Sequence, residues 1–392
     1  MSVDIGGLDL VARTLFDPPG PDRRYLLLRG RLKVSAFLPA DAPTAAARSL
    51  LRRTDETRMV PLVGRAVLAT GFRSRLLPLA IRERATLPGV GDASLARAIA
   101  DLLGLEDLIV AGALGPVRPN LKPVLQIFGP DGGTVAFVKV GWNDLTRELV
   151  EHEHATLASI TARDPLRLPR ALGLLRHGES CALVLSPLPL WRLGRRPRSW
   201  PDARTVRTIA ESAGPIRHEL LSTSTYWNEL SDLADDHALP HRESFVRGLD
   251  IVAAGLAEAP IRFGASHGDF SPWNTLRSRG TIAVWDWERF RADAPVGLDL
   301  VHYVTQMRAR RPIDAMPEVA AGDFADVVPG LTALGVDARG IDAFVTMYYL
   351  DLLARYVRDS RRADVPAVSE MSAAIDRALM ARLARADARM RR

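Results

Sequence analysis

His-Gly-Asp-Phe-Ser-Pro-Trp-Asn at residues 267–274 is followed by Val-Trp-Asp-Trp-Glu at residues 284–288. In these two segments Asp269 precedes Asn274 by five positions, and Asp286 follows Asn274 by twelve. Mg²⁺ takes oxygen ligands and is commonly held by one or two carboxylates together with substrate phosphates. A further carboxylate can accept the proton of an attacking hydroxyl group. The spacing therefore predicts phosphoryl transfer from a nucleotide triphosphate, which depends on positioning and on neutralising charge.

The two segments resemble the catalytic loop and metal motif of the aminoglycoside phosphotransferase and choline kinase group, small-molecule relatives of the protein kinases. In that group His-Gly-Asp replaces His-Arg-Asp, and Asp-x-Glu replaces Asp-Phe-Gly. The resemblance implies ATP and Mg²⁺ as cofactors, with Asp269 as the base and Asn274 and Asp286 as metal ligands. Glu288 matches the Glu of Asp-x-Glu, for which a direct or water-mediated role at the metal is implied.

Neighbouring residues support this functional interpretation, although ordinary structural explanations also exist for some of them. The run at residues 281–285 predicts a short strand that ends at the second motif. Asp299 resembles the aspartate that braces the catalytic loop in this family, although a proline here precedes the glycine, and helix capping is an equally good local account. An ordinary strand-to-turn junction would explain His-Gly-Asp alone. His267 is expected to fix the loop rather than to carry a proton.

A kinase also requires a phosphate-binding lysine, and the composition makes that residue conspicuous. Among 52 basic residues only three are lysines: Lys33, Lys122 and Lys139. Lys139 lies in the strand-like run at residues 134–140, which resembles the Val-Ala-Ile-Lys element of kinases. A compact ammonium and a guanidinium are not interchangeable at a phosphate site. Lys139 is therefore the predicted phosphate ligand, with an ordinary surface lysine at a strand end as the alternative.

An acidic partner for the lysine is expected on the helix predicted over residues 144–160, where apolar residues recur at helical intervals. We favour Glu153, because Glu-His-Ala-Thr-Leu at residues 153–157 is similar to the family's Glu-x-x-x-Leu. Glu148 and Glu151 remain alternatives, and a solvated helix carboxylate is the structural interpretation for each.

Two weaker signals concern the nucleotide. Apolar runs at 108–110 and 124–128 flank a Gly- and Pro-containing turn that could cover the phosphates, with Arg118, Asn120 and Lys122 as candidates, although a plain hairpin turn is nearly as plausible. A predicted hairpin over residues 171–185 leads into a rigid Ser-Pro-Leu-Pro linker. By resemblance this linker is the hinge, and the backbone of Ser186 and Leu188 would contact adenine.

The resemblance implies an α+β, bilobal protein-kinase-like fold with a β-rich N-lobe and a mostly helical C-lobe. We assign residues 1–95 to an extra N-terminal accessory region, 96–187 to the nucleotide-binding N-lobe and 188–392 to the C-lobe. The accessory region should contain strands near 25–28 and 32–34 and a helix over 44–52. Helices are predicted over 92–103, 202–221, 242–256, 298–307, 341–358 and 368–389.

Composition narrows the class of protein. The net charge of +6 could suggest nucleic acid, but the arginines are scattered rather than gathered with aromatic residues into a stripe, so no such partner is expected. The single cysteine excludes an intrachain disulfide, and neither a leader nor an apolar run of membrane-spanning length is evident. The expected location is the cytoplasm, with no membrane association; the oligomeric state is not predicted.

The favoured function is thus a small-molecule hydroxyl kinase. Residues 351–392 contain six acids and ten arginines, which makes a polycationic aminoglycoside less suitable as substrate than a sugar, an amino sugar or a similar metabolite. A catalytically silent nucleotide-binding regulator of the same fold is one alternative. A protein kinase is another, disfavoured because His-Gly-Asp and Asp-Trp-Glu depart from its motifs and no Ala-Pro-Glu segment follows.

Overall fold

The computed structural model describes residues 6–29, 34–51, 69–74, 81, 83–113, 122–188, 201–256, 260–278, 280–309, 315–362 and 366–390. The chain divides into two compact units. The first comprises Met1–Ala158 and Leu168–Gly194, and the second comprises Ser159–Arg167 and Arg195–Arg392. Lys33, Arg118 and Asn120 lie outside the described residues.

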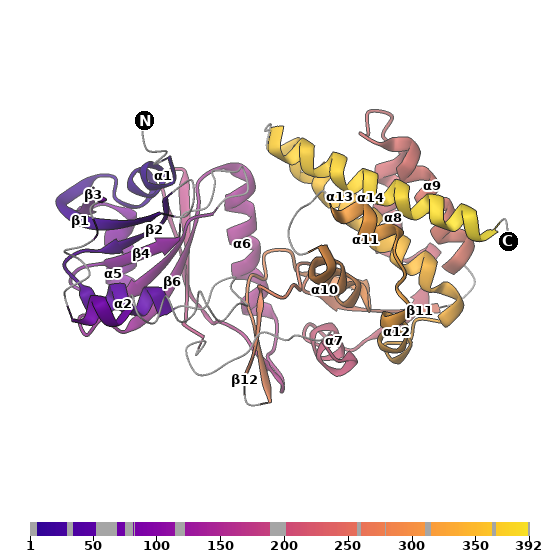
Figure 1. Cartoon of the computed structure of the whole chain (residues 1–392), viewed down its shortest axis with the longest axis horizontal. Helices are drawn as coiled ribbons and strands as arrows, with labels where there is room; N and C mark the ends of the chain where they lie inside the picture. The colour runs from indigo at the N-terminus through magenta and orange to yellow at the C-terminus, as the bar shows by residue number, and fades with distance from the viewer. Residues whose placement is uncertain are drawn as a thin grey trace. The chain divides into compact units, whose positions relative to one another are not determined.

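An eight-stranded antiparallel sheet forms the centre of the first unit, in the order β3-β1-β2-β4-β5-β6-β9-β8 (Figure 1). Its strands are β1 (Pro19–Arg29), β2 (Val34–Pro39), β3 (Arg84–Val90), β4 (Ile109–Ala113), β5 (Val124–Phe128), β6 (Thr134–Gly141), β8 (Ala171–His177) and β9 (Ser180–Leu185). The helices with described bounds in this unit are α1 (Gly6–Leu15), α2 (Pro43–Leu51), α5 (Leu95–Leu103) and α6 (Asp144–Ser159).

Both faces of this sheet are buried. Neighbouring residues along a strand point to opposite sides, so each face has its own set of core side chains. Leu27 and Val110 pack with α1 and α5 on one face, whereas Leu26 and Ala111 pack with α2 on the other. Towards β9, Leu183 and its neighbours pack against α6. Helices on both sides thus hold β6, the strand that carries Lys139, in the interior of the sheet.

The expected boundary at residue 95 falls within this unit rather than between units. Strands β1, β2 and β3 from residues 1–95 share the sheet with β4 to β9, and β2 pairs directly with β4 through Phe37 and Gly112. The unit ends at Gly194, seven residues after the expected end of the nucleotide-binding part, and Ser159–Arg167 groups with the second unit.

The second unit is mainly helical, as expected, with two small three-stranded sheets. Its helices are α7 (Ala203–Ala210), α8 (Thr225–Asp235), α9 (Arg242–Leu256), α10 (Leu298–Ala309), α11 (Met316–Ala321), α12 (Val328–Ala333), α13 (Ile341–Arg362) and α14 (Pro366–Met390). The sheets have the orders β10-β11-β14 and β12-β13-β7, formed by β7 (Leu166–Arg167), β10 (Arg217–Leu220), β11 (Pro260–Ser266), β12 (Thr275–Ser278), β13 (Thr281–Val284) and β14 (Arg291–Pro295). The predicted α+β class, with a β-rich first part and a mostly helical second part, is confirmed.

One helix prediction was wrong in extent. The helix expected over residues 202–221 ends at Ala210, and residues 217–220 form β10, which pairs with β11. The segment between contains Gly214, with φ +156°, followed by Pro215. Proline cannot donate a helical hydrogen bond and its ring clashes with the preceding turn, so the helix cannot continue through this point.

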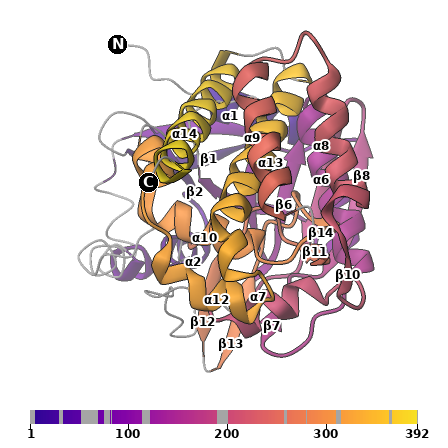
Figure 2. The ribbon, with the colours of Figure 1, turned by 90° about the vertical axis from the view of Figure 1, so that its right-hand side faces the viewer.

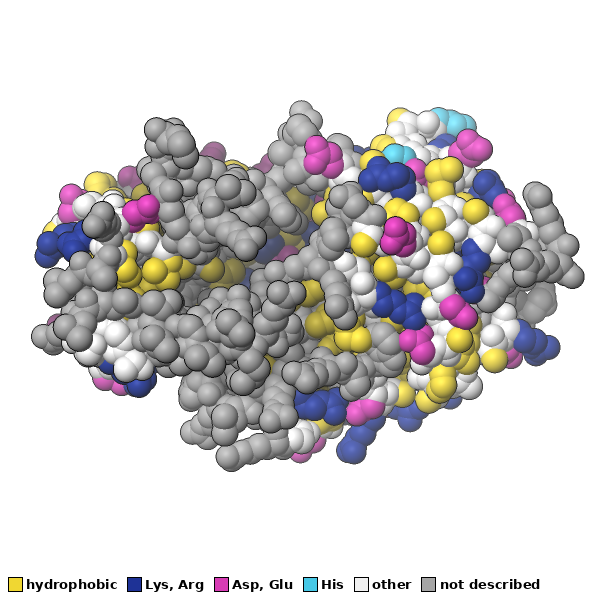
Figure 3. Space-filling view, in the orientation of Figure 1, with side chains coloured by type: hydrophobic (Ala, Val, Ile, Leu, Met, Phe, Trp, Pro, Cys, Tyr) yellow, Lys and Arg dark blue, Asp and Glu magenta, His cyan; other side chains and the backbone are white. Residues whose placement is uncertain are grey.

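Helix α13 is the centre of the helical part and is buried along most of its length. It packs against α9, α10 and α14, and Figure 2 shows α9 and α14 close to it. Basic and acidic side chains are interspersed on the face of the second unit drawn in Figure 3. Several of the unit's arginines form ion pairs, such as Arg247 with Asp387. None of the helices within the described ranges is long and apolar enough to cross a membrane.

Candidate active site

The first motif begins directly where β11 ends, at Ser266. Gly268 has φ +77°, in the left-handed region that glycine adopts without a steric penalty. A Cβ atom at this position would lie 2.0 Å from the carbonyl oxygen of Arg289. The chain therefore turns sharply at Gly268, and only glycine fits the approach of the two backbone segments.

Replacing Gly268 by alanine is expected to distort this turn and lower both stability and activity. The substituted residue would combine an unfavourable φ with a backbone clash, so a loss of about 1–3 kcal/mol in unfolding free energy is expected for the strained conformation alone. Chemical denaturation would measure it. Gly280→Ala is a matched control for φ alone, since Gly280 also has positive φ (+80°) but has no atom near its virtual Cβ. Equal losses in the two variants would contradict the clash.

Asp299, at the start of α10, holds the backbone of this loop through hydrogen bonds. Its Oδ2 accepts the N–H of His267 at 2.8 Å, and its Oδ1 accepts the N–H of Gly268 at 3.0 Å. The same Oδ1 accepts the hydroxyl of Ser266 at 2.9 Å. The predicted bracing role of Asp299 is confirmed, because one buried carboxylate satisfies two backbone donors of the loop.

His267 is a fixed, neutral part of the loop. Its Nδ1 accepts the backbone N–H of Asp269 at 3.1 Å, so the ring proton lies on Nε2, which donates to the carbonyl oxygen of Trp285 at 3.1 Å. Its ring packs on Trp287, with centroids 4.5 Å apart. Burial lowers the pKa of His267. As predicted from the sequence, this histidine positions the loop; here it also joins the first motif to the second.

The carboxylate of Asp269 is held at both oxygens. Oδ1 accepts a hydrogen bond from Nε2 of His302 at 2.9 Å, and Oδ2 accepts one from Nδ2 of Asn274 at 2.9 Å. Burial by itself would raise the pKa of Asp269, but the hydrogen bond from His302 favours the ionised form, and the pKa lies below the ordinary value. The side chain is still 31% exposed. An ionised carboxylate is thus fixed in orientation and accessible from outside.

Asn274 and Asp286 lie at the two ends of the β12–β13 hairpin. The N–H of Trp285 donates to the carbonyl oxygen of Asn274 at 3.1 Å, which brings the two motifs together. Because Nδ2 of Asn274 donates to Asp269, the amide oxygen is the atom with which Asn274 would bind a cation. Asp286 has φ +74°, and its carboxylate and that of Glu288 have oxygens within 4.8 Å of each other. These oxygen donors suit Mg²⁺.

In the first unit, the structure pairs the predicted lysine with the favoured glutamate. Nζ of Lys139 lies 2.5 Å from Oε2 of Glu153, and their side chains are 7% and 0% exposed. Of the alternatives, Glu151 instead forms an ion pair with Arg176 at 2.8 Å on the outer face of α6. A buried lysine and glutamate in contact form a fixed ion pair on adjacent elements, β6 and α6.

The remaining expected nucleotide contacts are described only in part. Lys122 lies two residues before β5, where Val124 pairs with Lys139 across the sheet. The N–H of Ser186 donates to the carbonyl oxygen of Arg170 at 2.8 Å, so a base contact at Ser186 would use another atom. Leu188 is buried. These contacts to a nucleotide stay predictions.

The sequence did not draw attention to four side chains that support this site. His302 and Tyr348 lie on α10 and α13, and Arg289 forms a bidentate pair with Asp359 of α13 at 2.9 and 2.6 Å. His302 follows Asp299 by three residues on a helix, which places both on one side, so this spacing was an available signal. No local pattern indicated Tyr348 or Asp359, since they come from a helix far along the chain.

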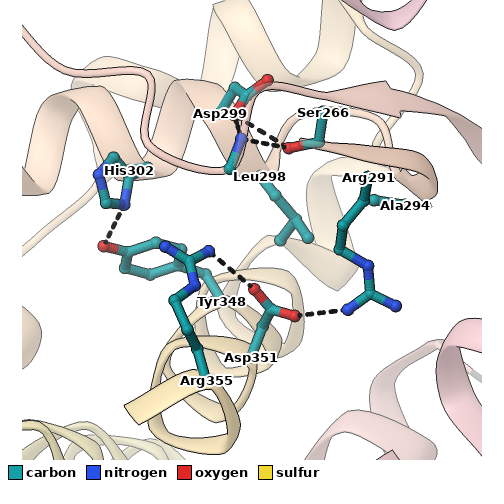
Figure 4. Close-up of a pocket in the computed structure, with 10 residues that line it drawn as sticks. Ser266, Arg291, Ala294, Leu298, Asp299, His302, Tyr348, Asp351 and Arg355 are labelled. Atoms are coloured by element: carbon teal, nitrogen blue, oxygen red, sulfur yellow. Dashed lines mark hydrogen bonds and ion pairs between the residues drawn. The ribbon is translucent and has the colours of Figure 1, made fainter. Parts of the chain in front are cut away.

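A small pocket lies beside the loop (Figure 4). Gly268 and His302 form part of its lining together with Tyr348, Arg291 and Arg355. Between the two arginines lies Asp351, at 3.3 Å from Arg291 and 3.5 Å from Arg355. The acidic side chain of Asp351 thus pairs with both arginines of this lining, which also includes the apolar residues Ala294 and Leu298.

Comparison with known proteins gives a likeness of fold. No protein-family model matches the chain, and no curated protein matches it. The apo form of a thermostable mutant of aminoglycoside phosphotransferase APH(4)-Ia aligns with a TM-score of 0.45 and 16% identity, over 72% of this chain and 98% of that one. Similar structures are phosphotransferases and kinases of the group that the motifs resemble.

Two further solved structures are also similar to this chain. Spectinomycin phosphotransferase APH(9)-Ia in complex with ADP and spectinomycin aligns with a TM-score of 0.41 and 11% identity, over 74% of this chain and 97% of that one. A choline/ethanolamine kinase family protein from Mesorhizobium loti aligns with a TM-score of 0.37 and 17% identity, over 74% of this chain and 97% of that one.

Proposed function

We propose that this protein is an ATP-dependent phosphotransferase that moves the γ-phosphoryl group of ATP to a hydroxyl group of a small molecule. The observation that carries the proposal is the carboxylate of Asp269, which is ionised, partly exposed and held at both oxygens by Asn274 and His302. Such a carboxylate is suited to accept a proton from a hydroxyl group placed next to it.

In this proposal Asp269 is the general base. It orients the acceptor hydroxyl and takes its proton as the oxygen attacks phosphorus, a contribution of about 10²- to 10⁴-fold in rate. Asp299 and His267 keep the loop fixed, so that the carboxylate does not need to reorganise during the reaction. The fixed loop supports a reaction that depends chiefly on positioning.

Asn274, Asp286 and Glu288 would hold Mg²⁺. Bound there, the ion would neutralise charge on the phosphates of the nucleotide. The amide oxygen of Asn274 and the neighbouring carboxylates of Asp286 and Glu288 are oxygen donors of the type that Mg²⁺ prefers. The role of Glu288 is the less direct one, because water can mediate it.

Lys139 would bind the phosphates of ATP as a point charge, and Glu153 would hold its ammonium in place. Arg118, Asn120 and Lys122 are the proposed contacts of the loop over the phosphates, and Ser186 and Leu188 those of the hinge. For the acceptor we propose a sugar, an amino sugar or a similar neutral or anionic metabolite rather than an aminoglycoside. The proposal includes a cytoplasmic location and neither nucleic acid nor membrane as a partner.

An ATP-consumption screen over sugars, amino sugars, nucleosides and aminoglycosides tests the proposed function. Acceptor-dependent release of ADP, with a phosphorylated product identified by mass spectrometry, would support it. Binding of Mg²⁺-ATP without transfer to any acceptor would favour the silent regulator instead.

Asp286→Asn should weaken the binding of Mg²⁺-nucleotide by about tenfold or more, because it removes one anionic ligand of the ion. Calorimetry with a non-hydrolysable ATP analogue, with and without Mg²⁺, measures this effect apart from turnover. The affinity measured without Mg²⁺ should change little. Asp250→Asn, on the exposed face of α9, is a matched control. An unchanged Mg²⁺ dependence would remove Asp286 from the metal site.

A further inference from the structure

His302 connects the base to the helical core of the second unit. From α10, its Nε2 lies 2.9 Å from Oδ1 of Asp269. Its Nδ1 lies 3.2 Å from the hydroxyl of Tyr348 on α13, a contact drawn in Figure 4. His302 and Tyr348 are only 4% and 3% exposed. The three side chains thus form a continuous hydrogen-bonded chain from the partly exposed carboxylate into the interior.

The direction of these hydrogen bonds follows from the carboxylate: ionised Asp269 can only accept, so Nε2 of His302 donates to it and Nδ1 of the neutral ring accepts from Tyr348. Burial raises the pKa of Tyr348 well above its ordinary value, so the phenol keeps its proton and can donate it. When Tyr348 donates to Nδ1 of His302, the neutral ring carries its proton on Nε2. That proton points at Asp269. Tyr348 therefore selects the tautomer of His302 that can donate to the carboxylate.

The orientation of the carboxylate depends on this donor. Asn274 holds Oδ2, and His302 holds Oδ1, so the plane of the carboxylate is set by two donors from separate elements. With Asn274 alone, the side chain could rotate about a single hydrogen bond. A base has to lie within hydrogen-bond reach of the proton that it takes, and small displacements cost much of the rate.

We propose that His302 is a positioning residue for the Asp269 base, and that Tyr348 fixes the tautomer and the orientation of the His302 ring. This role rests on the proposed phosphotransferase function, but the hold of His302 on the carboxylate can be measured without turnover. Neither residue touches the nucleotide or the acceptor in this proposal.

The charged and titratable neighbours of this chain are few among the described residues. His267 and Asp286 act electrostatically on Asp269, as does Tyr356 of α13. Arg355 and Asp351, also on α13, share the pocket lining with His302. These neighbouring groups are the same in wild type and in a His302 variant. A difference between their pH profiles, measured in the same buffer, therefore comes from the substitution at His302.

Two amide substitutions at His302 distinguish the roles of its two ring nitrogens. The amide nitrogen of glutamine reaches about as far from the backbone as Nε2, so His302→Gln can still donate to Asp269. The amide group of asparagine replaces Nδ1 instead, so His302→Asn keeps a polar contact to Tyr348 but loses the donor to the base. Both variants remove the ring and are of similar polarity, so each is the other's control for packing.

We expect kcat to fall by about 10- to 100-fold in His302→Asn, while the KM for ATP stays near the wild-type value. His302→Gln should recover most of this loss. The acid limb of the kcat profile should move to higher pH by about one unit in His302→Asn, because Asp269 loses a donor that favours its ionised form. Equal losses of kcat in both variants with an unmoved acid limb would show a merely structural role and overturn the proposal.

A measurement without turnover keeps the two proposals apart. Carbonyl ¹³C NMR of aspartate-labelled protein, with the Asp269 signal assigned by Asp269→Asn, gives the pKa of this carboxyl directly. A rise in His302→Asn that is absent or smaller in His302→Gln supports the positioning role even if the wild type transfers no phosphoryl group, in which case the proposed function alone fails. An unchanged Asp269 pKa in both variants overturns the role of His302.

Tyr348→Phe is the second variant if substitution of His302 prevents folding. It leaves the imidazole in place and removes only the group that selects its tautomer. The pKa of Asp269 should rise, and kcat should fall by less than in His302→Asn. Wild-type values of both in Tyr348→Phe would contradict the proposed action of the tyrosine.

Discussion

Asp269→Asn is expected to abolish phosphoryl transfer and to leave nucleotide affinity close to that of the wild type. Asparagine has nearly the same shape, but an amide cannot accept the hydroxyl proton as a carboxylate does. The expected loss in kcat is about 10²- to 10⁴-fold. Because the residue is not a proposed ligand of the nucleotide, calorimetric binding of Mg²⁺-ATP should change little. Steady-state kinetics with the acceptor identified in the screen measures the loss.

The pH dependence of wild-type activity also tests the role of Asp269 as the base. Since the pKa of Asp269 lies below the ordinary carboxyl value, the base is ionised throughout the neutral range, and activity should fall only as the pH drops through that lowered pKa. The stabilisation from the ionised form follows the same sign: it is present above the unfolded-state pKa and is lost as the pH falls towards the folded-state pKa. Turnover by Asp269→Asn equal to that of Asp250→Asn would remove Asp269 from its role.

Lys139→Met should lower the stability of the first unit by about 3–5 kcal/mol, because it leaves the carboxylate of Glu153 buried without its cation. Transfer activity should be lost as well, since the phosphates would lose their point charge. Thermal and denaturant unfolding, followed by circular dichroism, measures the first effect independently of any substrate. Hydrogen exchange at the amides of β6 assigns the change to this unit.

The partner substitution provides the control for this prediction. Glu153→Gln keeps the shape but removes the negative charge, and Lys139→Met with Glu153→Gln removes both charges. If the loss comes from an uncompensated buried charge, the double variant should be more stable than Lys139→Met, with an interaction energy of about 0.5–3 kcal/mol in the double-mutant cycle. Strictly additive losses would show that the two side chains do not stabilise each other. Activity should not return in the double variant.

Local patterns predicted most of the elements that carry the site. The strand ending near Lys139 is β6, the helix with Glu153 is α6, and the helix predicted over residues 92–103 is α5, which Ser94 caps. These features are set by residues close in sequence, through alternation, helical spacing and a capping hydroxyl. The hydrogen bonds of Asp299 to the loop followed from the resemblance and are present.

What the sequence did not predict depends on residues far apart. The pairing of β2 with β4 joins Phe37 to Gly112, and no local pattern identifies such a partner strand. Likewise, the contacts of Asp269 with His302 and of His302 with Tyr348 depend on how α10 and α13 pack. One helix was expected to run to residue 221 because the apolar spacing continues that far. It ends early, at Ala210, because a Gly-Pro pair interrupts the segment. Long-range packing decided the strand pairing and the contacts of His302, whereas the local Gly-Pro pair decided the end of the helix.

The continuity of the large sheet across residue 95 bears on how this chain could have evolved. A strand edge exposes unpaired backbone donors and acceptors that readily pair with other chains. Since β2 covers the edge of β4, a genetic exchange with a crossover at residue 95 would uncover that edge on one product and leave an incomplete sheet on the other. The first 95 residues are therefore expected to be inherited together with the rest of the sheet, as one heritable block and not as an interchangeable module.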